Sequence, residues 1–192
     1  MFVIMIGDEE NRKDIGYKLK KILVTGASGY IAKHCLLELI KGGYSVKGTV
    51  RSLAKGNNVK VDLAKHLNKD INIEFVETTL DNSRGWDKAV EGCDAILHVA
   101  SPFPRKHIEN ENDLIIPAQE GTIHVLNAAK KVGIERVVIT SSNAAISYGH
   151  ENKDTFDETC WTNIDADSVT AYTKSKTIAE KSAWDFVSKN LK

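Results

Sequence analysis

The stretch that decides the fold is residues 22–32, Ile-Leu-Val-Thr-Gly-Ala-Ser-Gly-Tyr-Ile-Ala. It begins with the apolar run Ile22-Leu23-Val24, which is typical of a strand buried on both faces. Gly26 and Gly29 then permit a tight turn, and apolar residues recur at helical spacing as far as the glycine pair 42–43. A strand, a glycine turn and a helix in this order form the first unit of a doubly wound parallel sheet.

Strands and helices alternate along the rest of the chain. We predict four further strands at residues 44–50, 71–76, 95–99 and 136–140, and further helices at 53–67, 86–90, 113–132 and 168–190. The helix at 53–67 is expected to be interrupted by Gly56. This alternation predicts the α/β class, with a doubly wound, Rossmann-like parallel sheet and helices on both faces.

The domain organisation expected from this pattern is simple. Residues 21–192 are predicted to form one Rossmann-like domain, and residues 1–20 an N-terminal extension. The apolar run 2–6 in that extension leaves three interpretations open: an added strand, a disordered arm, or an artefact of cloning or of the gene prediction.

The composition limits the classes of function. The 192 residues suffice for one domain with a sizeable core but not for two ordinary ones. Lys plus Arg and Asp plus Glu number 26 each, which argues against a nucleic-acid binder that relies on bulk positive charge. Three widely spaced cysteines argue against a disulfide framework or a cysteine metal site and fit the cytoplasm. No apolar run reaches the roughly 18 residues of a membrane helix, so no membrane partner is expected.

The glycine turn has the chemistry of a dinucleotide site. Gly26 allows the tight turn, Gly29 lets the backbone approach a pyrophosphate, and Ala32 is small enough for close packing of the helix on the sheet. The amides and dipole of the helix N-terminus then face the phosphates. Taken alone, the same residues also suit an ordinary strand-to-helix turn.

The residues after the second strand indicate which dinucleotide is preferred. No acidic residue lies between Glu38 and Asp62, and Arg51 directly follows the strand. Lysines occupy positions 47, 55 and 60. Because NAD sites usually carry an acidic residue here and an arginine fits a 2′-phosphate, we expect NADP(H) to be preferred, with NAD(H) possible. The alternative is that these cations are only solvated.

Three polar side chains suggest carbonyl chemistry. Tyr172 and Lys176 are four residues apart on one helix face, so an ammonium can bring the tyrosine pKa toward working pH. The tyrosine can then donate a proton as hydride reaches a carbonyl carbon. Ser142 lies at the carboxyl end of the fifth strand, where doubly wound folds bind ligands. The glycine turn, the serine and the tyrosine–lysine pair in this order are unlikely to coincide by chance.

With these motifs, the chain resembles the extended short-chain dehydrogenases/reductases of the NAD-dependent epimerase/dehydratase superfamily. The similarity is to the dihydroflavonol reductase-like, cinnamoyl-CoA reductase-like and yeast methylglyoxal/aldehyde reductase-like group. It is carried by residues 24–32, 48–51, 92–94, 98–102, 138–142, 157–161 and 172–180.

The resemblance implies NADPH-dependent reduction of a small-molecule aldehyde or ketone to an alcohol. Ser142 matches the catalytic serine, Tyr172 the proton donor and Lys176 its partner. The implied cofactor-binding residues are Gly26, Ser28, Gly29, Tyr30, Ile31, Arg51, Thr79, Leu80, Val99, Ala100, Ser101, Tyr172 and Lys176.

Two departures from the family pattern matter. Thr79-Leu80 stands where the family has an Asp-Leu pair, with Asp81 one place later. The chain also stops at Lys192, where family members add a sixth strand and a substrate lobe. We therefore expect the cofactor half of such an enzyme, weak or inactive by itself and able to self-associate through the open edge of strand 136–140. A non-catalytic NADP-binding module and a sugar-nucleotide epimerase or dehydratase remain alternatives.

Overall fold

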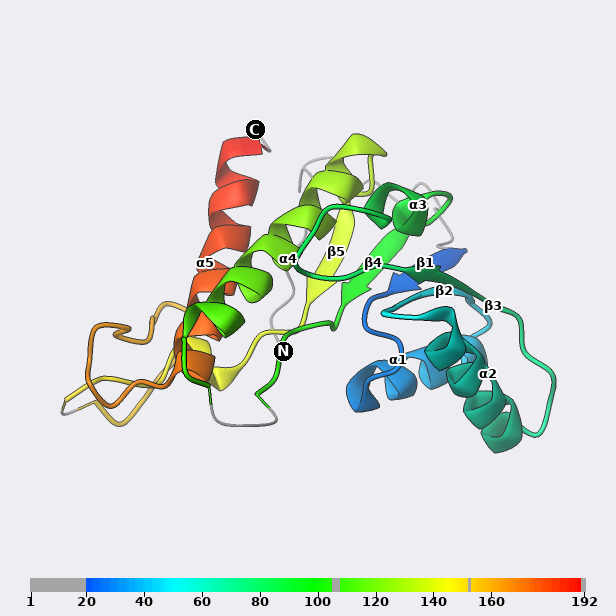
Figure 1. Cartoon of the computed structure of the whole chain (residues 1–192). Coiled ribbons are helices and arrows are strands. Elements are labelled where there is room, and N and C mark those ends of the chain that lie inside the picture. The colour runs from blue at the N-terminus through cyan, green and yellow to red at the C-terminus, as the bar shows by residue number, and fades with distance from the viewer. Residues whose placement is uncertain (1–19, 105–107, 152, 191–192) are drawn as a thin grey trace.

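A computed structural model describes residues 20–104, 108–151 and 153–190. Its centre is a five-stranded parallel sheet in the order β3-β2-β1-β4-β5 (Figure 1). The strands are β1 (Lys21–Val24), β2 (Ser45–Val50), β3 (Ile73–Glu77), β4 (Ala95–His98) and β5 (Arg136–Ile139). This order confirms the predicted doubly wound, Rossmann-like sheet.

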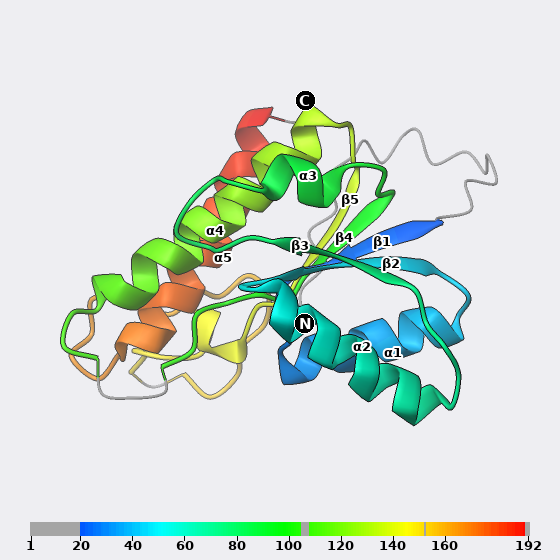
Figure 2. The same cartoon turned by 45° about the vertical axis from the view of Figure 1, so that its right-hand side comes forward.

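Helices cover both faces of the sheet. α1 (Tyr30–Lys41) and α2 (Leu53–Leu67) lie on one face, and α3 (Trp86–Val90), α4 (Asn112–Lys131) and α5 (Ala171–Asn190) lie on the other (Figures 1 and 2). A short 3₁₀ turn, η2 (Asn143–Ala145), follows β5 and packs against α5. The chain therefore crosses from one face to the other between β1 and β4, which is the switch point where such folds bind ligands.

The apolar strands bury side chains on both faces, which explains why they read as continuous apolar runs. Leu23 packs with Ile96 and Val137 under α3, α4 and α5. Its neighbour Val24 points to the opposite face and packs with residues of α1 and α2, including Leu36. Successive strand residues alternate between faces, so the two core clusters share the sheet as their common wall.

Gly56 does not interrupt α2, and that expectation was wrong. The helix runs without a break from Leu53 to Leu67. A Cβ atom at position 56 would lie 2.7 Å from Cγ of Phe75, so the glycine lets α2 pack closely on β3. Here close helix-to-sheet packing outweighs the weak helix propensity of glycine.

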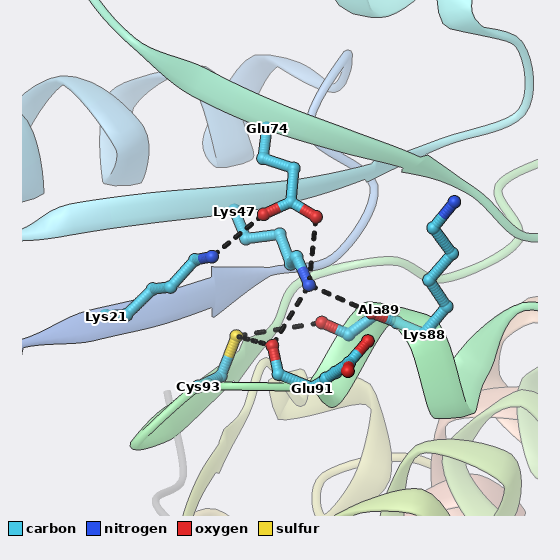
Figure 3. A network of polar contacts seen from close by, with 7 residues as sticks. All are labelled: Lys21, Lys47, Glu74, Lys88, Ala89, Glu91 and Cys93. Carbon is cyan, nitrogen blue, oxygen red and sulfur yellow. Dashed lines mark hydrogen bonds and ion pairs between the residues drawn. The ribbon is translucent and has the colours of Figure 1, made fainter.

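Lys47 is buried, which corrects its assignment to the cations near the cofactor ribose. Its side chain is 3% exposed, and Nζ donates to the carbonyl oxygens of Lys88 (2.9 Å) and Glu91 (3.0 Å) at the end of α3. Glu74 completes the network, 3.1 Å from Lys47 and 2.8 Å from Lys21 (Figure 3). Because a helix C-terminus leaves carbonyls unpaired and partly negative, this ammonium is satisfied in the interior.

One edge of the sheet is formed by β5. Within the described residues, β5 pairs with β4 alone, so the predicted open edge is present. The expected extension at 1–20 lies outside the described residues except for Lys20, whose amide donates to Asp94 at 2.7 Å. Among the helices of the described ranges, none is long and apolar enough to cross a membrane.

Candidate active site

The glycine turn after β1 is compact and lies against the end of β4. Gly26 has a φ of +64°, a conformation that favours glycine. A Cβ atom there would lie 3.0 Å from Cβ of Ala100, so the close approach also requires a glycine. The amide of Gly29 donates to the carbonyl of Gly26 at 2.8 Å and closes the turn before α1.

The amino end of α1 is open. Gly29 is the N-cap, and in the described structure no side chain caps the helix and its first turn carries no acidic residue. Tyr30 is 81% exposed and Ile31 is also exposed. Free amides and the positive end of a helix dipole suit an anion, so this terminus fits a pyrophosphate without rearrangement of a cap.

Thr25 fixes the end of β4 beside this turn. Its hydroxyl oxygen accepts hydrogen bonds from the amides of Val99 and Ala100, both at 3.0 Å. The same oxygen lies 2.9 Å from Nδ1 of His98. Since its acceptor positions are taken, Thr25 must donate its proton to Nδ1, which leaves the neutral ring with its hydrogen on Nε2. Thr25 was not among the predicted site residues.

The residues expected near the cofactor ribose lie at the ends of β2 and β3. Arg51 is exposed directly after β2, as are Lys55 and Lys60 on α2. The carboxylate of Glu77, at the end of β3, accepts a hydrogen bond of 2.7 Å from the amide of Leu53 and so caps the start of α2. Of these exposed cations, Arg51 is the one that lies directly at the end of β2.

The Thr79-Leu80 pair is engaged locally. The Thr79 hydroxyl accepts a bond of 2.6 Å from the side-chain amide of Asn82, and a hydrogen bond from Thr79 holds the pKa of Asp81 below its usual range. The side chain of Leu80 packs on α4, where a Cβ atom at Gly121 would be 2.5 Å from it. Since both side chains of the Thr79-Leu80 pair are engaged within the protein, its backbone atoms are the groups that can contact a ligand.

Lys176 is the best-defined polar group at the carboxyl end of the sheet. Lys176 is 7% exposed, and its Nζ donates a 2.9 Å hydrogen bond to the carbonyl of Thr140, directly after β5. Burial lowers the pKa of Lys176, and the negative charge of Glu180 partly opposes that shift. Lys174 faces elsewhere and pairs with Glu111 at 2.8 Å.

Ser142 and Tyr172 lie on the elements that adjoin this lysine, η2 and α5. Ser142 caps η2, with its hydroxyl accepting from the amide of Ala144 at 3.2 Å. η2 is held on α5 by the Thr177 hydroxyl, which donates to the carbonyl of Ala144 at 3.4 Å. Tyr172 lies one turn before Lys176, and its ring meets the ring of Phe103 edge to face, with centroids 5.4 Å apart.

The three predicted catalytic side chains therefore lie on neighbouring elements at one end of the sheet. Tyr172 packs on the segment that follows β4, and that segment begins at Ala100 beside Gly26. Within the described residues no direct hydrogen bond joins Ser142, Tyr172 and Lys176, and the nearest link is the bond of Lys176 to Thr140. No cluster of three metal-ligating side chains occurs in these ranges either.

Comparison with known proteins agrees with this geometry. Residues 22–191 match the model of the NAD dependent epimerase/dehydratase family. The fold is that of a doubly wound α/β domain with its open helix terminus at the switch point. The chain belongs to the NAD dependent epimerase/dehydratase family.

Among its relatives are reductases. The chain is 40% identical over 179 residues to cinnamoyl-CoA reductase CAD2 of Medicago truncatula, covering 88% of this chain and 53% of that protein. It is 33% identical over 175 residues to dihydroflavonol 4-reductase of Dianthus caryophyllus, with coverages of 88% and 48%. The chain thus spans about half the length of the curated relatives it matches.

Solved structures give the same result. Yeast methylglyoxal/isovaleraldehyde reductase Gre2 complexed with NADPH matches with a TM-score of 0.75 and 32% identity, covering 88% of this chain and 53% of that one. Gre2 from Candida albicans in complex with NADPH matches with a TM-score of 0.76 and 34% identity, covering 89% and 54%. These similarities confirm the predicted group within the family.

Proposed function

We propose that residues 21–192 form the NADP(H)-binding domain of a carbonyl reductase that converts a small-molecule aldehyde or ketone to an alcohol. The observation that carries the proposal is a juxtaposition. The open amino end of α1, formed by the Gly26 turn, lies at the same end of the sheet as Lys176 and Tyr172. A dinucleotide on that helix terminus reaches across the strand ends toward the tyrosine–lysine pair.

The residues present fit such a cofactor. The turn residues Gly26, Ser28, Gly29, Tyr30 and Ile31 surround the open helix terminus and suit the pyrophosphate. Arg51 suits the 2′-phosphate, because its guanidinium forms bidentate, charge-assisted contacts. The remaining segments at the strand ends, Thr79-Leu80 and Val99-Ala100-Ser101, suit the adenine and the length of the dinucleotide. The NADPH in both Gre2 structures supports the same preference.

In the proposed reaction the nicotinamide, when bound, supplies a hydride to the carbonyl carbon. Tyr172 gives its hydroxyl proton to the carbonyl oxygen, and the Lys176 ammonium favours this transfer by stabilising the phenolate that remains. The Ser142 hydroxyl donates a hydrogen bond to the same oxygen and stabilises its developing charge. Thr140 holds Lys176 in place through its backbone carbonyl.

A non-catalytic NADP-binding module is the second candidate, because within the described residues no direct hydrogen bond joins Ser142, Tyr172 and Lys176. Turnover of simple aldehydes with NADPH separates the two functions. The named relatives are reductases, which favours a reductase over an epimerase or dehydratase. We also propose a cytoplasmic location, which fits the three free cysteines Cys35, Cys93 and Cys160.

Titration of NADPH and NADH into the wild-type protein and Arg51→Ala tests the cofactor assignment. We expect the wild type to prefer NADPH and Arg51→Ala to lose roughly 1.5–3 kcal/mol of NADPH affinity, the range of a charge-assisted contact. NADH binding should change little. Lys65→Ala, an exposed lysine in the last turn of α2 that was not assigned to the cofactor, is the matched control. Equal wild-type affinities for the two dinucleotides would contradict the assignment.

A further inference from the structure

Beside Lys176 the structure contains a small, partly open cavity, bounded by the ends of β4 and β5 and by α4 and α5. Its volume is about 10 Å³, roughly the room needed for one water molecule. The polar residues of its wall are His98, Ser101, Thr122, Thr140, Ser141, Lys176 and Glu180. A cavity of this size with several polar partners is suited to hold a bound water.

Glu180 is a buried carboxylate in this wall. It is 5% exposed and lies one helical turn after Lys176 on α5. The hydroxyl of Ser141 donates to its Oε2, and the indole Nε1 of Trp184 donates to its Oε1 at 3.4 Å. A buried carboxylate is costly unless it is paired or hydrogen-bonded, so these donors and a nearby cation account for its place here.

The other groups that face Lys176 offer no negative charge. β4 contributes His98, whose pKa is lowered to about 3, first by burial and then by the charge of Lys176, so the ring is neutral. The end of β5 contributes the Thr140 carbonyl and the Ser141 hydroxyl. α4 contributes Ala118 and Thr122, and α5 contributes Ala179 besides Glu180. Glu180 is the only carboxylate among the described residues that line the cavity.

The two charged groups do not bond directly within the described residues, yet both line the same cavity. A water molecule there can accept from the Lys176 ammonium and donate to the Glu180 carboxylate, and such a bridge is nearly as favourable as a direct hydrogen bond. We propose that Glu180 is the positioning residue of Lys176: anchored by Ser141 and acting through a cavity water, it keeps the ammonium charged at the end of β5. The inference rests on the proposed function, because Lys176 belongs to the proposed active site.

The test measures the charge of Lys176 directly and does not depend on turnover. The full chain is produced with 13C-labelled lysine, and NMR follows the Cε signal of Lys176 as the pH is changed. The signal is assigned by its absence from the spectrum of Lys176→Met. Glu180→Gln keeps the shape and an oxygen for Ser141 but removes the charge. We expect the pKa of Lys176 to fall by about one unit or more, the usual effect of losing a nearby opposite charge. In Glu180→Asp, which keeps the negative charge, the pKa of Lys176 should fall less than in Glu180→Gln.

The control is Glu120→Gln, which removes an exposed carboxylate on α4 and should leave the titration of Lys176 unchanged. If Glu180→Gln lowers thermal stability but leaves the Lys176 pKa at its wild-type value, Glu180 is merely structural and the proposal is overturned. If Glu180→Gln does not fold, the titration of Glu180→Met decides, because this variant also removes the charge: a lowered Lys176 pKa supports the proposal and an unchanged one overturns it.

NADPH titration of the wild type separates this inference from the proposed function. Absence of NADPH binding together with the expected Lys176 shift would reject the cofactor assignment and keep the coupling of Glu180 to Lys176. Normal NADPH binding together with an unchanged pKa of Lys176 in Glu180→Gln would keep the cofactor assignment and reject the coupling of Glu180 to Lys176.

Discussion

The hydroxyl oxygen of Thr25 lies 2.9 Å from Nδ1 of His98 and also accepts the amides of Val99 and Ala100. These three contacts join the end of β1 to the end of β4 at the point where the glycine turn begins. They hold His98 in one neutral tautomer inside the core, so the ring must stay unprotonated for the fold to keep this arrangement.

Acid should therefore weaken the fold through His98. Burial lowers its pKa to about 3 in the folded protein, against about 6.5 when unfolded. Between these values the unfolded chain binds a proton that the folded chain does not, so the free energy of unfolding falls as pH drops below 6.5 and is flat above it. The slope contributed by His98 approaches about 1.4 kcal/mol per pH unit.

His98→Asn, which keeps an acceptor for Thr25, should show a shallower loss of stability between pH 6.5 and 5, above the range where carboxylates titrate. The change corresponds to about one proton fewer taken up on unfolding. Denaturant melts at several pH values measure it. His66→Gln, at an exposed position of α2, should retain the wild-type slope. An identical slope in His98→Asn and the wild type would show that His98 is not the titrating group.

Lys47 should be worth more to stability than any exposed lysine. Lys47→Met keeps most of the buried volume but removes the donor to the Lys88 and Glu91 carbonyls and the partner of Glu74. We expect the free energy of unfolding to fall by roughly 1–3 kcal/mol, since two partly buried carbonyls lose a charged donor while the half-exposed Glu74 regains water. Urea melts of this variant and of Lys60→Met test the difference. Equal losses in both variants would contradict the role given to the network.

Much of the fold was predictable because it rests on local signals. The period of the apolar residues and the glycine turn predicted all five strands and the doubly wound parallel class of their sheet. The tertiary setting of single residues was not predictable. Lys47 reads as a solvated cation in Val46-Lys47-Gly48, and only the packing of α3 over β2 buries it. Gly56 reads as a helix breaker until the Phe75 ring is seen beside it.

In the candidate site, too, local motifs predicted some residues, whereas contacts between distant residues could not be predicted. The motifs located the glycine turn, Ser142, Tyr172 and Lys176 at strand ends and on one helix, because parallel strands bring their carboxyl ends to one edge. The contacts of Glu180 with Ser141 join residues 39 positions apart, so no spacing rule marks them. A hydroxyl at the end of a strand, such as Thr25, was the one available signal for the link to His98.

Gly26 should be needed for the cofactor beyond its effect on stability. Gly26→Ala adds a Cβ that meets Ala100 at 3.0 Å and forces an L residue to a φ of +64°. Gly43→Ala is the matched control, with a φ of +81° and open space around the new atom. Both variants should lose about 1 kcal/mol or more of stability from the left-handed backbone. Only Gly26→Ala should lose NADPH binding, measured by titration at a temperature where both are folded. Retained binding in Gly26→Ala would place the cofactor elsewhere.

The open edge of β5 should make the protein self-associate. Within the described residues β5 pairs on one side only, and an unpaired strand edge is a template for another chain. Val138 is half-buried on this strand, so Val138→Lys places a charge at the edge without cutting into the core. We expect the mass in solution to rise with concentration for the wild type and to stay monomeric for Val138→Lys, because a lysine on an edge strand blocks strand addition. Sedimentation velocity over a range of concentrations measures this change in mass.

Val132→Lys, at an exposed apolar position beyond the end of α4, is the control and should self-associate as the wild type does. A wild-type protein that stays monomeric at all concentrations would show that the edge is not an association surface.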